Sequence, residues 1–253
     1  MTQWISHRGE SADAPENTLP AYLLAGERDT DGFELDIHLT EDGKLVCIHD
    51  SDTWRTCQGI SRIVENTSFD DLEKLDASYM KNGFDGVKIP LFSDALKCLK
   101  PGKVCFVEIK ENNPAVIDAM IEVEREAGIS PERIVMISFH SEIVRIFKQR
   151  FPERTALFLA SSLCNEGGIR EDRMEELFRT ACEIKADGVD IFLAPQFISR
   201  EFVRRIHDAG LKCAVWTVDQ ASAAKSWKDA GADAITSNCA AKVREWVRTH
   251  PNG

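Results

Sequence analysis

The sequence contains no apolar run approaching 18 residues, the length that a membrane-spanning helix requires. Its first residues also lack the charged segment, apolar stretch and small-residue cleavage site of a secretory leader. We therefore expect a chain with no membrane span that works in the cytoplasm.

Positive charge is also scarce. The 253 residues include 31 Lys and Arg against 42 Asp and Glu, for a formal net charge of −11. A chain with this balance is not attracted to nucleic acid or to anionic membranes, so we expect neither as a partner. To bind an anionic small molecule, the site would need local positive charge from a metal ion or from individually placed Arg and Lys side chains.

The eight cysteines form no CxxC pair and show no regular spacing, which disfavours a zinc site or a disulfide framework. Cys47, Cys105 and Cys213 lie inside apolar runs and are expected to be small core residues. Cysteines used in this way indicate a reducing compartment.

Eight short β-rich runs alternate with amphipathic helical patterns along the chain. The runs cover residues 4–9, 33–39, 103–110, 133–139, 155–160, 188–194, 212–218 and 233–238. This alternation predicts a parallel sheet, and eight repeats predict an α/β fold of the (β/α)8 TIM-barrel type, as one domain over residues 1–253. The alternative is a doubly wound sheet, which normally carries a Gly-rich phosphate loop after its first strand. Here "SHRGESADAPEN" contains no GxGxxG.

The regular alternation breaks after the second predicted strand. "TEDG" supplies an Asp-Gly turn into residues 44–50, which we interpret as the returning strand of a hairpin. Residues 51–90 then form an irregular segment before the next helix, near Phe92. Long loops in compact domains are usually functional, so we predict that this segment is an inserted cap over the barrel mouth.

Ionisable residues gather near the ends of the second and third predicted strands, at the edge where barrel enzymes build their active sites. Glu34 and Asp36 share one face of the second strand, and Glu108 and Lys110 share one face of the third. Three neighbouring carboxylates repel one another unless protons or a cation lie among them. An oxygen-only trio suits one hard divalent cation, Mg²⁺ or Ca²⁺, whereas zinc favours His or Cys ligands.

Two histidines flank this predicted metal site. His7 and Arg8 end the first strand, and His49 ends the hairpin return. Imidazole titrates near neutrality, so the two histidines can donate and accept protons within one reaction cycle. His38 lies past the carboxylate pair, near the turn, and is left out of the catalytic set. The remaining histidines lie at or within predicted helices and are expected to be ordinary surface residues: His140, His207 and His250.

The order of short motifs along the chain resembles that of the glycerophosphodiester phosphodiesterases, in particular the bacterial cytosolic type. The motifs are "HRG" (7–9), "PENT" (15–18), "ELD" (34–36), "TEDG" (40–43), "HD" (49–50), "VEIK" (107–110), "WTV" (216–218) and "GADAITSN" (231–238). Together they span nearly the full chain, and the set is far more specific than any single motif. One departure is Ser237, which stands where members of that family commonly carry Asp.

The resemblance implies a TIM barrel with a small insertion after strand 2, and hydrolysis of glycerophosphodiesters to sn-glycerol 3-phosphate and an alcohol. The residues it assigns are the metal ligands Glu34, Asp36 and Glu108, the general acid and base His7 and His49 in either order, the phosphate-binding Arg8 and Lys110, the supporting Glu16 and Asn17, and Trp216 in the pocket wall. Direct attack by water and initial attack by the glycerol 2-hydroxyl both stay open. So do the head-group preference and the formation of a homo-oligomer.

Three other functions fit the sequence less well. A lipid phosphodiesterase of the sphingomyelinase D kind is disfavoured, because those barrels are secreted, carry disulfides and lack the long insertion. A glycosidase would leave Lys110 without a task beside Glu108. A non-catalytic barrel that binds a phosphorylated ligand would not need both His7 and His49.

Overall fold

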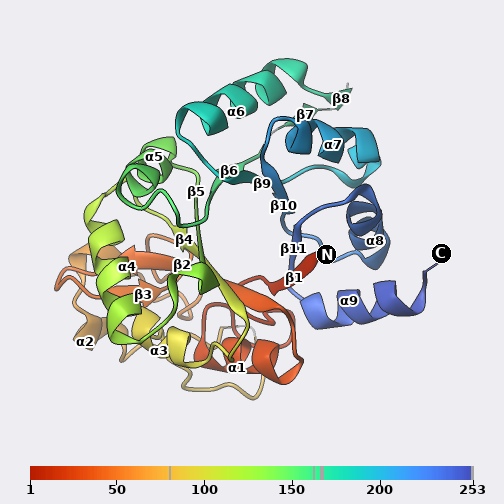
Figure 1. Cartoon of the computed structure of the whole chain (residues 1–253). Coiled ribbons are helices and arrows are strands. Elements are labelled where there is room, and N and C mark those ends of the chain that lie inside the picture. The colour runs from red at the N-terminus through yellow and green to blue at the C-terminus, as the bar shows by residue number, and fades with distance from the viewer. Residues whose placement is uncertain (80, 162, 166–167, 252–253) are drawn as a thin grey trace.

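Eight parallel strands close into a ring in the computed structural model, which describes residues 1–79, 81–161, 163–165 and 168–251 (Figure 1). The barrel strands are β1 (Gln3–Ser6), β2 (Gly32–Leu39), β4 (Val104–Ile109), β5 (Ile134–Ser138), β6 (Ala156–Ala160), β9 (Gly188–Ile191), β10 (Lys212–Val215) and β11 (Ala234–Ser237). Each pairs with the next in this order, and β1 pairs with both β2 and β11, which closes the ring. The predicted (β/α)8 barrel is therefore confirmed.

The helices lie around the outside of this ring (Figure 1). They are α1 (Leu19–Glu27), α3 (Phe92–Lys97), α4 (Ala115–Glu126), α5 (Ser141–Arg150), α6 (Glu171–Glu183), α7 (Arg200–Asp208), α8 (Ala221–Ala230) and α9 (Ala240–Thr249). In α7 the Ser199 side chain accepts a hydrogen bond from the Phe202 amide at 3.1 Å and so begins the helix. Gly231 ends α8 with a left-handed φ of 103°, as the Gly in the sequence pattern predicts.

Several predicted strands extend too far at their carboxyl ends. The first was expected to reach Gly9, but β1 ends at Ser6. Arg8 and Gly9 have φ of 54° and 78°, a left-handed backbone that cannot continue a strand. A Cβ at Gly9 would lie 2.5 Å from the Ala21 carbonyl carbon, so α1 packs too closely here for any side chain. His7 and Arg8 therefore occupy a turn that follows the strand, at the rim of the barrel.

In the barrel and its ring of helices, apolar side chains fill two separate spaces. The larger lies between the strands and the helices and includes Cys47, Cys105 and Cys213, each buried and without a disulfide, as expected. The smaller lies inside the barrel and consists of Ile5, Phe106, Ile137, Leu157, Leu159, Ala214 and Ala234. The inner cluster forms the floor beneath the polar groups at the mouth.

Residues between β2 and α3 follow the predicted hairpin and then leave the barrel. β3 (Leu45–Cys47) pairs antiparallel with β2, and Ile37 lies opposite Cys47. The segment beyond contains the 3-10 turn η1 (Val64–Asn66) and the short helix α2 (Phe69–Leu72). It has an apolar cluster of its own, made of Val46, Ile48, Cys57, Val64, Leu72, Ala77 and Ile89. The inserted segment is thus anchored by its own packing.

The remaining short elements lie on the connections: the hairpin β7 (Cys164–Asn165) and β8 (Gly168–Ile169), and the 3-10 turns η2 (Pro131–Arg133) and η3 (Pro195–Phe197). Among the described residues, no helix combines the length and apolar character needed to cross a bilayer.

Candidate active site

Three carboxylates from two adjacent strands meet inside the barrel mouth. Glu34 and Asp36 extend from β2, and Glu108 lies directly opposite Asp36 on β4. Each offers an oxygen within 4.8 Å of the others, and all three residues are buried. The two-residue period of the strands places these acids on the inner face, where a barrel usually carries branched apolar side chains.

The pKa values within this trio diverge. Burial, together with the charge of Asp36, raises the pKa of Glu34 well above its usual value and that of Glu108 to about 7. Burial would raise the pKa of Asp36 too, but the neighbouring Arg8 and Lys110 hold it below its usual value. Oδ1 of Asp36 forms no hydrogen bond among the described residues, although Lys110 Nζ lies 3.4 Å from it. A crowded, buried set of carboxylate oxygens with spare acceptor capacity fits a hard divalent cation.

Two basic side chains hold this acidic cluster in place. The backbone amide of Arg8 donates to Glu34 at 2.9 Å, and its guanidinium lies 3.2 Å from Asp36 and 2.8 Å from Glu16. Lys110 Nζ lies 2.7 Å from Glu108 and 3.4 Å from Asp36. Both cations are thus at the rim, next to the carboxylates, where the sequence predicted them.

Asn17 of the "PENT" motif holds one of the three carboxylates, that of Asp36. Its amide Nδ2 donates to Asp36 at 2.8 Å, while its Oδ1 accepts from the Asp36 amide at 3.2 Å and from the Tyr22 hydroxyl at 3.0 Å. Asn17 adopts a φ of 54°, which Asn tolerates better than most residues. The turn therefore fixes the direction of the Asp36 side chain.

His7 lies next to the carboxylates. Its Nε2 is 4.0 Å from Glu34, and its Nδ1 is 2.8 Å from Oδ1 of Asn238. Asn238 donates in turn to Asp219 at 2.6 Å. Burial, with the charge of Arg8, lowers the pKa of His7 to about 4, so its imidazole is neutral at pH 7.

His49 has a different neighbour. Its Nδ1 lies 2.6 Å from the Asp50 carboxylate, which also accepts from Arg55 Nε at 2.6 Å. Arg55 belongs to the inserted segment and pairs with Glu16 at 2.7 Å. Burial lowers the pKa of His49 despite the nearby Asp36 and Asp50. A chain of charged contacts therefore links His49 to the insertion and, through Glu16, to Arg8.

Side chains around these groups enclose a small inner cavity of about 60 Å³. It is lined by His7, Arg8, Glu34, His49, Glu108, Ile137, Phe139, Leu159, Asp190, Trp216 and Thr236. Trp216 forms part of its wall and packs edge-on against Phe139 at 5.7 Å between ring centroids. Asp190, from β9, is buried, its Oδ1 has no hydrogen-bond partner within the described part of the chain, and burial raises its pKa to about 8.

Several residues around the histidines and the inner cavity were not predicted from the sequence. Asn238 and Asp219 hold His7, Asp50 and Arg55 hold His49, and Asp190 lines the cavity. Asp190 had a detectable signal, because "GVDIFLA" places a carboxylate inside a barrel strand. Asn238, Asp219 and Arg55 act through contacts between distant loops, for which the sequence has no local signal.

The other histidines behave differently from one another. His38 is buried, with Nδ1 2.8 Å from Glu111 and Nε2 3.2 Å from the carbonyl of His49, so it supports the loop outside the cavity. His140 lies at the start of α5, as expected; it is partly exposed, and its Nε2 lies 3.0 Å from the Lys110 carbonyl. His207 and His250 are exposed, as expected.

The chain matches known proteins along almost its whole length. Residues 7–242 match the model of the glycerophosphoryl diester phosphodiesterase family. Glycerophosphodiester phosphodiesterase 1 of Bos taurus is 31% identical over 238 residues, covering 85% of this chain and 71% of the relative. The glycerophosphodiester phosphodiesterase of Caldanaerobacter subterraneus subsp. tengcongensis is 31% identical over 237 residues, covering 91% of each chain.

A solved structure is similar in both sequence and shape. An Oleispira antarctica phosphodiesterase, in complex with the product sn-glycerol-3-phosphate, superimposes with a TM-score of 0.82 at 26% identity. The match covers 98% of this chain and 97% of that one.

Proposed function

The chain belongs to the glycerophosphoryl diester phosphodiesterase family, and on that basis we propose that it hydrolyses glycerophosphodiesters to sn-glycerol 3-phosphate and an alcohol with the help of one divalent cation. The observation that carries this proposal is the meeting of three carboxylates, two histidines and two basic side chains at one end of the barrel. The product bound by the Oleispira antarctica relative supports the choice of substrate class.

Glu34, Asp36 and Glu108 would hold the cation, which we propose to be Mg²⁺ or Ca²⁺ because the donors are all carboxylate oxygens. When bound, such an ion neutralises negative charge on the phosphate oxygens and lowers the pKa of a coordinated hydroxyl. Trp216 would close one wall of the pocket against water.

Arg8 and Lys110 would bind the non-bridging phosphate oxygens. Both remain cationic at pH 7, because the surrounding carboxylates raise their pKa values although burial acts against this. Negative charge builds up on these oxygens during displacement at phosphorus. Losing one such group typically costs on the order of 3 kcal/mol of transition-state stabilisation.

We assign the general base to His7 and the general acid to His49. His7 is neutral and faces the carboxylate cluster, and its Nδ1 meets the uncharged amide of Asn238, so Nε2 is ready to accept a proton. His49 meets the Asp50 carboxylate, which stabilises the imidazolium against the burial that lowers the pKa of His49 and so helps keep a proton available for the departing alkoxide. Asp50 and Asn238 would each fix the orientation of one imidazole ring.

The most direct test is hydrolysis of glycerophosphocholine, glycerophosphoethanolamine and glycerophosphoglycerol, each with Mg²⁺, Ca²⁺ or EDTA. We expect glycerol 3-phosphate to be released with one or both ions and the rate to be abolished by EDTA. Turnover that persists in EDTA would overturn the metal assignment, and no hydrolysis of any diester with either ion would overturn the proposed function.

Two variants test the histidines in the same assay. His7→Ala and His49→Ala should each abolish turnover while calorimetry still detects cation binding. A rate like that of the unmodified chain in either variant would refute the catalytic role of that histidine.

We also propose that the protein works in the reducing cytoplasm. The proposal is supported by its eight cysteines, all of which are free thiols in the structure.

A further inference from the structure

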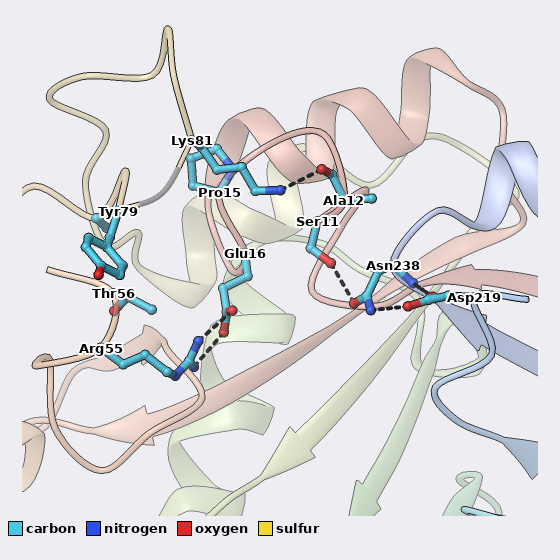
Figure 2. A pocket seen from close by; sticks show the side chains of 11 residues that line it. Ser11, Ala12, Pro15, Glu16, Arg55, Thr56, Tyr79, Lys81, Asp219 and Asn238 are labelled. Carbon is cyan, nitrogen blue, oxygen red and sulfur yellow. Dashed lines mark hydrogen bonds and ion pairs between the residues drawn. The ribbon is translucent and has the colours of Figure 1, made fainter. Parts of the chain in front are cut away.

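A larger pocket lies on the outer side of the histidines, and none of the roles described above uses it. We call it the outer pocket; its volume is about 490 Å³, and its walls include Glu16, Arg55, Tyr79, Lys81, Asp219 and Asn238. Figure 2 shows that these side chains come from segments far apart in the chain and surround a common space. Glu16 precedes α1, residues 55–81 belong to the insertion, and Asp219 and Asn238 follow β10 and β11.

Direct contacts join the walls of the outer pocket to the proposed catalytic groups. Asn238 is hydrogen-bonded to His7 at 2.8 Å, and Glu16 is paired with Arg8 at 2.8 Å. Arg55 reaches Asp50, the partner of His49, at 2.6 Å. The outer pocket therefore adjoins the inner cavity. The side chains between the two spaces contact the residues that we propose to act on the phosphate.

The sizes of the two spaces indicate how a diester would divide between them. The inner cavity has a volume of only about 60 Å³, against about 490 Å³ for the outer pocket. It is too small for both substituents of a phosphodiester. The groove on the opposite flank, about 330 Å³, shares Phe139 and Leu159 with the inner cavity. Its two charged residues, Arg173 and Glu176, pair with each other at 2.8 Å, which leaves neither free for a charged head group. The outer pocket is the larger of the two spaces beside the site, at about 490 Å³.

Two opposite charges in the outer pocket have no counter-ion within the part of the chain that the structure describes. Asp219 accepts hydrogen bonds from the Ser237 hydroxyl and from the amide and side chain of Asn238, none of which is a cation. Lys81 Nζ donates to the backbone carbonyl of Ala12 at 2.6 Å and meets no carboxylate. By contrast, Glu16 and Arg55 neutralise each other.

We propose that the outer pocket is the subsite for the alcohol portion of the diester, and that it selects a zwitterionic head group of the amino-acid type. The ammonium of such a group would pair with Asp219 and its carboxylate with Lys81, so that glycerophosphoserine would be preferred. The assignment rests on the proposed phosphodiesterase function and adds to it the chemistry of the leaving alcohol.

The first experiment compares kcat/KM for glycerophosphoserine, glycerophosphoethanolamine and glycerophosphoglycerol with the cation-loaded protein. The serine ester should be the best substrate. Lys81→Met should lower its kcat/KM relative to the glycerol ester by roughly tenfold, the usual effect of losing one hydrogen bond to a charged group. Lys88→Met is the matched control, because Lys88 also donates to backbone carbonyls within the insertion and does not line the outer pocket.

Asp219→Asn tests the other charge. Asp219 also holds Asn238 beside His7, so kcat/KM should fall for all three esters in this variant. The informative quantity is therefore the ratio of kcat/KM between esters. The serine and ethanolamine esters, which carry an ammonium, should each lose roughly tenfold more than the glycerol ester.

A binding measurement separates head-group recognition from turnover. In His49→Ala loaded with Ca²⁺, calorimetry should show glycerophosphoserine binding more tightly than glycerophosphoglycerol, and adding Lys81→Met should remove the difference. Equal kcat/KM for the three esters, or equal losses in Lys81→Met, would overturn the subsite and leave the proposed function intact. No hydrolysis of any ester would overturn both.

Discussion

Asp50→Asn should separate the roles of the two histidines. The Asp50 carboxylate lies 2.6 Å from Nδ1 of His49, and Arg55 holds it from the other side at 2.6 Å. Asn has nearly the same shape but no charge, so the substitution removes the group that stabilises the His49 imidazolium. The contact of His7 with Asn238 is left as it is.

The magnitude follows from the hydrogen bond and its exposure. A hydrogen bond to a charged group contributes about 1.5–3 kcal/mol. The His49 and Asp50 side chains are 33% and 30% exposed, so water screens the pair and the lower end applies. A loss of about 1.4 kcal/mol corresponds to a pKa about one unit lower and to a tenfold change in an equilibrium.

The pH profile should change in one direction. A general acid must be protonated, so activity is lost as the pH rises through the pKa of His49. Because the bond to Asp50 raises that pKa, its removal should shift the alkaline limb of kcat/KM about one unit lower and reduce the rate at pH 7 about tenfold. The acidic limb, set by His7, should not move.

Steady-state hydrolysis of glycerophosphoglycerol between pH 3 and 9 measures both limbs, because the pKa of His7, which sets the acidic limb, is about 4. Asp52→Asn is the control, because Asp52 belongs to the same loop but accepts from the Trp54 amide and has no contact with His49. An alkaline limb that stays in place or moves upward would refute the assignment of His49 as the acid. If only the acidic limb moved, His49 would be the general base and His7 the general acid.

Three further predictions concern the scaffold and the metal site. Gly32→Ala should lower the free energy of unfolding in urea by about 1–3 kcal/mol, because the new Cβ would lie 2.0 Å from the Val104 carbonyl oxygen; an unchanged midpoint would contradict this packing. Glu124→Ala should cost about 3–5 kcal/mol by leaving Arg154 charged and unpaired in the interior, with kcat/KM at 25 °C unaltered; stability within 1 kcal/mol of the unmodified chain would refute this. Glu34→Gln should weaken Mg²⁺ or Ca²⁺ binding in calorimetry, and an identical titration would remove it from the ligand set.

Much of the fold and part of the site could be predicted because they depend on local periodicity. The alternation of strands and helices is enough to predict the barrel, since parallel strands need helical crossovers to connect them. The same two-residue period places Glu34 and Asp36 on one face, and the pairing of β2 with β4 brings Glu108 beside them. The strand ends were harder to predict, because the turn at Arg8 and Gly9 depends on how closely α1 packs there.

The sequence by itself thus determined the architecture and the chemical types at the barrel mouth: three acids, two histidines and two bases at strand ends. Only the tertiary structure decided how the histidines differ, because Asn238 reaches His7 and Arg55 reaches Asp50 from distant loops. Closure of the ring brings β11 beside β1, and the insertion folds back toward the rim. A hydrogen bond depends on distance in space, which a linear pattern does not encode, so these contacts and the outer pocket appear only once the chain is folded.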